Sequence, residues 1–153
     1  LYLFHILEWM DVNYDFREKF INDSWGNQDN IDDWSQMVIK HTEDTIEYVH
    51  EAPGSGIWNM FDNGHIKFDR MDTHRRAVES EREAFFLRIT KKGDYLYEGA
   101  DMGILVSRGR MMTDDFKLNP RAKSWINAIK AQYSSEMVED KREQVMLKGS
   151  LTK

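Results

Sequence analysis

The chain has 153 residues, of which 41% are hydrophobic and 12% aromatic, and this size and composition suit one folded domain over residues 1–153. It has no cysteine, which excludes disulfides, thiolate catalysis and cysteine-ligated zinc or iron–sulfur sites. The net charge of −6 is uneven, because residues 1–63 carry 13 acidic and 3 basic side chains, whereas residues 64–153 carry 14 and 18. We expect the two halves to neutralise each other within one fold, or to orient partners.

The N-terminal third predicts two helices. Apolar residues recur at spacings of three and four between Leu3 and Met10, so residues 1–22 predict a first helix. This apolar run is too short for a membrane span, which needs about 20 residues. A second helix is expected from Asn30, a good N-cap, to the proline- and glycine-rich stretch 51–56.

A hairpin and a central helix are expected next. Residues 57–70 have two apolar-rich arms around Asn63-Gly64, a dipeptide typical of a type I′ turn. A glutamate-rich stretch after His74 predicts a central helix. The apolar run 85–90 could end that helix or begin a strand, because a short apolar run fits either.

The C-terminal part predicts strands and a long helix. Residues 95–99 and 104–109 have strand composition between glycines. Asn119-Pro120 predicts an N-cap followed by proline at the first helical position, and the helix should run towards Leu147. The expected fold is therefore α+β: a single helix-rich domain with two N-terminal helices, a β-hairpin, a central helix, a short antiparallel strand region and a long C-terminal helix.

The stretch HTEDTIEYVH (41–50) contains Glu47 and His50 in the spacing E-x-x-H, which di-iron helix bundles use for half of a metal site. On a helix, Glu43, Glu47 and His50 share a polar face that points away from the core. No second E-x-x-H occurs in the chain. We therefore expect no metal and no cofactor, and keep these three residues as the alternative metal set.

His41 falls on the other, apolar face of the same predicted helix, with Trp34, Val38 and Tyr48. A hydrogen-bonded core histidine is the favoured interpretation. A buried catalytic imidazole, paired with nearby acids, is the alternative.

Arg108 and Arg110 lie among the glycines of GADMGILVSRGR (99–110), which raises the possibility of an anion site. The spacing matches no phosphate-binding motif, so a turn before a strand is the simpler interpretation. Several cations between residues 108 and 130 could follow a nucleic-acid backbone, but the sequence pI of about 5.4 disfavours nucleic acid as a partner.

Because no nucleophile, phosphate loop or metal set is recognisable, we predict a non-catalytic interaction protein, a small subunit of a larger assembly. It would bind a protein partner or its own copies through surfaces rich in aromatic residues and methionine. The candidate interface residues are Trp9, Trp125, Tyr133 and Met137. The alternative is a small enzyme or ligand-binding domain with an aromatic-lined pocket and a histidine–acid pair.

Overall fold

The computed structural model describes residues 9–10, 34–72, 77–139, 146–147 and 149–150. The chain divides into two compact units, Leu1–Asp33 and Trp34–Lys153. The first predicted helix, 1–22, lies outside the described residues apart from Trp9 and Met10. The prediction of one domain over 1–153 stays a prediction.

The second unit is built mostly of antiparallel strands. In chain order its elements are β1 (Trp34–Lys40), β2 (Glu47–Glu51), β3 (Gly56–Met60), β4 (Ile66–Arg70), β5 (Glu83–Arg88), β6 (Tyr95–Leu96), β7 (Asp101–Arg108), α4 (Pro120–Lys130) and β8 (Ser134–Met137). The prediction of a helix-rich α+β domain is therefore wrong, because eight strands and a single bounded helix make up the described part of this unit.

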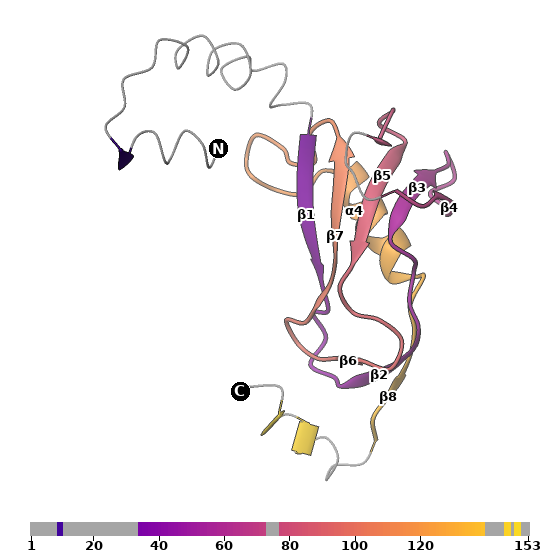
Figure 1. Ribbon diagram of the computed structural model, residues 1–153, viewed down its shortest axis with the longest axis vertical. Helices are drawn as coiled ribbons and strands as arrows, with labels where there is room; N and C mark the ends of the chain where they lie inside the picture. The colour runs from indigo at the N-terminus through magenta and orange to yellow at the C-terminus, as the bar shows by residue number, and fades with distance from the viewer. Residues whose placement is uncertain (1–8, 11–33, 73–76, 140–145, 148, 151–153) are drawn as a thin grey trace. The chain divides into compact units, whose positions relative to one another are not determined.

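The strands form two sheets. A five-stranded sheet has the order β1-β7-β5-β3-β4, and a three-stranded sheet has the order β6-β2-β8. Helix α4 lies behind the larger sheet, and the smaller sheet lies at its lower end (Figure 1). The first strand, β1, pairs with β7, so the two long strands of the larger sheet come from distant parts of the chain.

The predicted second helix, from Asn30 to 51–56, is wrong where the structure describes it, because the segment forms β1, a turn and β2. In β1 the side chains alternate: Ile39 is buried and Met37 packs against the core, while Val38 points to the other face and is exposed. The residues at 34, 38, 41, 45 and 48 fit a helical period by coincidence. Burial follows the period of two instead, because one face of the strand packs against α4.

The hairpin over 57–70 is confirmed, since β3 and β4 pair antiparallel from Ile57–Arg70 to Met60–Ile66. Its turn differs from the expected type I′, which needs positive φ at both central residues. Only Gly64 has positive φ, at 78°, and its N–H donates to the Phe61 carbonyl at 2.9 Å. Asn63 acts through its side chain, which accepts a bond from the His65 N–H at 3.1 Å.

The predicted central helix after His74 is also wrong in its described part. Residues 79–82 are irregular, and 83–88 form β5, a strand between β7 and β3. The ambiguous run 85–90 is thus mostly strand. Local helix propensity of the glutamates is overridden because Phe86 and Ala84 are fully buried against the other core residues.

Helix α4 begins where the sequence predicts. The Asn119 side chain accepts a bond from the Ala122 N–H at 2.8 Å, and Pro120 opens the helix. The prediction that it runs towards Leu147 is wrong, because it ends at Lys130 and the chain returns as β8. Side chains spaced along one face of α4 fill the core, namely Ala122, Trp125 and Ile129, all fully buried.

One core joins α4 to both sheets. It contains Phe86 and Leu105 from the larger sheet, Val49 and Leu96 from the smaller, and Trp125 from the helix. Among the described residues, no helix is long and apolar enough to cross a membrane.

Candidate functional site

The face of the larger sheet opposite α4 carries a row of apolar side chains. Val38, Ile104 and Leu87 lie directly opposite one another on β1, β7 and β5, and so share this face. Val38 is 46% exposed and Leu87 44% exposed. We call Val38, Ile104 and Leu87 the outer row.

A second row on the same face is partly covered. Val106 and Phe85 are opposite each other and half-buried, and Ile57 beside them is fully buried. The segment that precedes β5 contributes the fully buried Val78, whose carbonyl accepts a bond from Arg108 Nε at 2.9 Å. The outer row is therefore more open than the row beside it, in which Gln36 of β1 is exposed but Val106, Phe85 and Ile57 are partly or fully buried.

Arg108 and Arg110, the predicted anion-binding pair, bind different protein groups. The guanidinium of Arg108, besides bonding to Val78, lies 4.7 Å from the ring centre of Trp34. Arg110 donates to Asp114 at 2.7 Å in an exposed ion pair. Each guanidinium thus already has a partner within the fold, and anion binding here stays a prediction.

His41 is 5% exposed and bonded through both ring nitrogens. Its Nδ1 lies 3.2 Å from Glu43 Oε2, and its Nε2 lies 3.2 Å from the Thr45 hydroxyl and 3.8 Å from Glu47 Oε1. A helix would have separated His41 from these two acids. The turn between β1 and β2 brings them together. The prediction that His41 lies on one face of a helix and the two acids on the opposite face is therefore wrong.

The two acids also tie this turn to the C-terminal part of the unit. Glu47 accepts bonds from Thr45 at 3.0 Å and from Ser135 of β8 at 2.6 Å. Glu43 lies 3.8 Å from Lys130, at the end of α4. A backbone hydrogen bond from Thr42 is the main cause that lowers the pKa of Glu43. His41 thus lies in a network of hydrogen bonds and ion pairs, and a catalytic role for it stays a prediction.

His50 belongs to a different cluster from His41. Its Nε2 lies 3.1 Å from Glu136 of β8, and its ring packs edge-on against Tyr48 at 5.1 Å. Glu43 and Glu47 contact His41 instead. Within the described residues, no group of three or more histidine and acidic side chains is placed to hold a metal ion.

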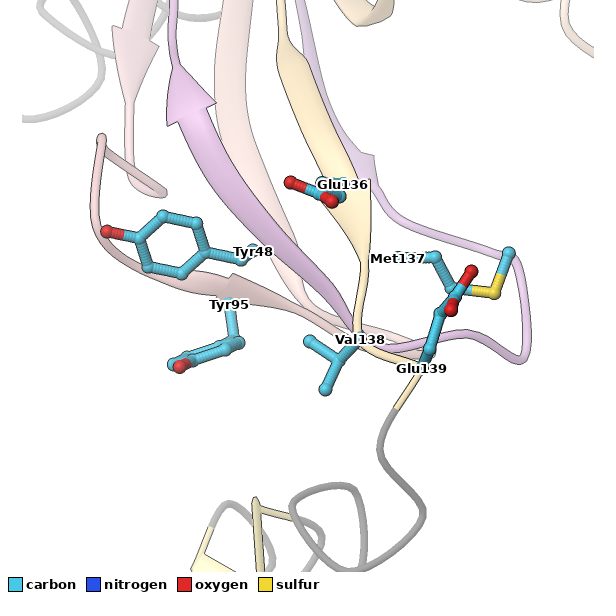
Figure 2. A pocket seen from close by; sticks show the side chains of 6 residues that line it. All are labelled: Tyr48, Tyr95, Glu136, Met137, Val138 and Glu139. Atoms are coloured by element: carbon cyan, nitrogen blue, oxygen red, sulfur yellow. The ribbon is translucent and has the colours of Figure 1, made fainter.

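A shallow pocket of about 440 Å³ lies at the smaller sheet. Its lining residues are Tyr48, Tyr95, Glu136, Met137, Val138 and Glu139. The two tyrosine rings meet edge-to-face at 5.4 Å, and in Figure 2 they lie on one side of β8, with Met137 and Glu139 on the other. The exposed Met137, a predicted interface residue, is thus at a surface.

The other predicted interface residues are spread widely. Trp125 is fully buried, so the core accounts for its apolar area. The Tyr133 hydroxyl donates to the Met102 carbonyl at 2.7 Å, and burial raises the pKa of this phenol. Trp9 belongs to the first unit and is exposed there. The structure therefore does not bring these residues into one surface within the second unit.

Comparison with protein-family models, with curated proteins and with solved structures finds no match to this chain. Sequence reasoning missed the outer row, because Val38 was assigned to a helix and Leu87 to an ambiguous run. The signal that could have found it is the continuous apolar run Met37-Val38-Ile39, because successive side chains of a strand point to opposite faces and such a run makes both faces apolar.

Proposed function

We propose that this chain is a non-catalytic interaction protein that docks a protein partner onto the outer row as a subunit of a larger assembly. The observation that carries the proposal is the apolar row Val38–Ile104–Leu87 on three adjacent strands, exposed at both ends. An antiparallel sheet with one face packed on the core normally presents polar side chains on its other face.

Docking there would remove apolar surface from water. Fully burying an aliphatic side chain contributes about 1.5–3 kcal/mol, so completing the burial of Val38 and Leu87, each nearly half exposed, contributes roughly 1 kcal/mol apiece. The neighbouring Ile104 and Val106 add apolar contact area. A contiguous apolar patch of this kind marks interaction sites more often than a scatter of single residues does.

The residues that could have supported catalysis are engaged elsewhere. Both ring nitrogens of His41 contact Glu43, Thr45 or Glu47, and the ring is buried. The alternative function, a ligand-binding domain, is favoured by one observation: the pocket with the Tyr48–Tyr95 pair beside the His50–Glu136 pair.

The test expresses the wild-type chain and Leu87→Lys, each with an affinity tag, in cells of the source organism, and compares the partner proteins recovered with each. Wild type should be recovered with a partner at fixed stoichiometry, and Leu87→Lys should lose that partner by about tenfold or more while its melting temperature changes little. Met71→Lys is the matched control, because Met71 is an exposed apolar residue just after β4 and outside the outer row.

Retention of the same partner at the same stoichiometry by Leu87→Lys would rule out the outer row as the docking surface. Recovery of the wild-type chain without any stoichiometric partner would count against the interaction function itself.

A further inference from the structure

The segment Arg110–Leu118, between β7 and α4, forms a small projecting turn that we call the knob. Met112 and Leu118 pair across its base. Thr113 closes it: its N–H donates to the Lys117 carbonyl at 2.8 Å, and its carbonyl accepts from the Phe116 N–H at 3.1 Å. The knob is thus an ordered element with its own hydrogen bonds.

Phe116 at the tip of the knob is unusual in two ways. It is 84% exposed, and its φ of 60° is the only positive φ at a non-glycine residue in the described part of the chain. A left-handed backbone suits glycine or asparagine, and a bulky side chain there is strained. Strain of this kind persists where the surrounding structure enforces it, and it clusters at functional sites.

The knob lies beside β1 (Figure 1). Residues of β1, of the knob and of α4 line an apolar groove. Its volume is about 330 Å³. The lining residues are Ser35, Gln36, Met37, Val38, Met111, Met112, Leu118 and Ile126. Three of them are methionines, whose flexible side chains adapt to an incoming group. The groove is at the small end of the range for ligand pockets, which suits a single inserted side chain.

We propose that this groove takes the Phe116 ring of a second copy of the chain, so that two copies exchange knobs around a twofold axis. The knob and the groove lie on the same surface, because Met112 and Leu118 belong to both. A twofold interface needs such a self-complementary surface, in which residue i meets residue j and j meets i.

The charges of the knob fit a second copy. Arg110 pairs with Asp114 at 2.7 Å, and Lys117 pairs with Asp115 at 2.7 Å, so the knob carries two cations and two anions. The ion pair with Lys117 also lowers the pKa of Asp115, which keeps its carboxylate charged. Two knobs therefore meet without net repulsion, and the acids of one can face the cations of the other.

The groove and the outer row share Val38, but Leu87 belongs to the outer row alone, so a change at Leu87 tests the docking face without altering the groove. Self-association is measured on the full chain by light scattering after size exclusion, from about 1 to 100 µM. We expect a dimer in the wild type and a rise of about tenfold or more in the dimer dissociation constant for Phe116→Ser. Phe61→Ser is the matched control, because Phe61 is an exposed phenylalanine in the β3–β4 turn, outside the knob and groove. Phe116→Asn removes the ring, but asparagine accepts a left-handed backbone, so the knob should keep its conformation. Loss of the dimer in this variant would therefore not be due to a folding defect.

A second measurement uses the absence of cysteine in the chain. Copies with Gln36→Cys are mixed with copies carrying Phe116→Cys. The Gln36→Cys copy keeps its Phe116 ring, which can still hold the pair together, and residue 116 of the other copy then lies at the groove that Gln36 lines, so oxidation should link the two kinds of copy. Phe61→Cys in place of Phe116→Cys should give much less cross-linking.

A wild-type monomer at every concentration, a dimer unaffected by both Phe116 variants, or equal cross-linking from Phe61→Cys would each overturn the proposal. Leu87→Lys should leave this dimer intact, so failure here and failure of the docking proposal are distinguishable.

Discussion

Gly103→Ala should destabilise the fold strongly, because Gly103 of β7 lies where the ring of Phe86 crosses the neighbouring strand. A Cβ added at Gly103 would lie 2.3 Å from Phe86 Cε2 and 2.8 Å from the Leu87 carbonyl oxygen. Carbon atoms in contact are normally about 3.5–4.0 Å apart, so the ring would have to move by more than about 1 Å. Phe86 is fully buried among core residues and has no free space to enter.

The magnitude follows from two opposing effects. Overpacking of a core costs about 1–3 kcal/mol, and a clash with both a buried ring and a backbone oxygen belongs at the upper end. Replacing glycine in a strand returns about 0.5–1 kcal/mol of backbone entropy. The net loss should be about 2 kcal/mol, which lowers the melting temperature of a chain of this size by about 4–8 °C.

Urea unfolding followed by tryptophan fluorescence, together with thermal unfolding by circular dichroism, measures this loss. Phe86→Leu shortens the clashing side chain, so the double variant with Gly103→Ala should be more stable than the sum of the single effects predicts, by about 1 kcal/mol. An unchanged melting temperature for Gly103→Ala, or strict additivity in the double variant, would refute the close packing of Phe86 of β5 against Gly103 of β7.

Two further predictions concern the bonds that hold the C-terminal part of the unit. Tyr133→Phe should cost about 1 kcal/mol in urea unfolding, because the Met102 carbonyl loses a bond of 2.7 Å at a half-buried site; no loss would show that water replaces the hydroxyl. Glu43→Gln should flatten the acid limb of the stability curve, measured as melting temperature against pH. The folded pKa of Glu43 is lowered from 4.5, so its stabilisation is present above that value and is lost as pH falls through the lower folded pKa. Since Glu43 is largely exposed, the effect should stay below about 1 kcal/mol, and an unchanged acid limb would contradict it.

The parts of the fold that the sequence predicts correctly rest on strong local signals. Asn119-Pro120 fixes the start of α4 through one cap bond, and the apolar arms around Gly64 fix the β3–β4 hairpin. The turn type was wrong because Asn63 bonds through its side chain and keeps an ordinary backbone. Local sequence signals thus gave the positions of the helix start and of the hairpin, but not the conformation of the hairpin turn.

The rest depends on contacts between distant residues, which local patterns do not reveal. Val38 and Leu87 form one row only because β7 lies between their strands and sets the register through Ile104. His41 meets Glu43 and Glu47 only because the chain turns at this point instead of continuing as a helix. A helical period over a stretch that contains both a strand and a turn was therefore misleading.

The strand order has a consequence for the order of events during synthesis. Among the described strands, β1 pairs with β7 alone, and β2 pairs with β6 and with β8, the last described strand. While a ribosome is still making residues 41–100, β1 has none of the backbone partners that it has in the finished fold. Sheets that depend on such long-range pairing form slowly. Their unpaired strand edges stay exposed in the meantime, which favours aggregation. We therefore expect nascent chains that stop before Asp101 to depend on chaperones more than chains that extend past Met137.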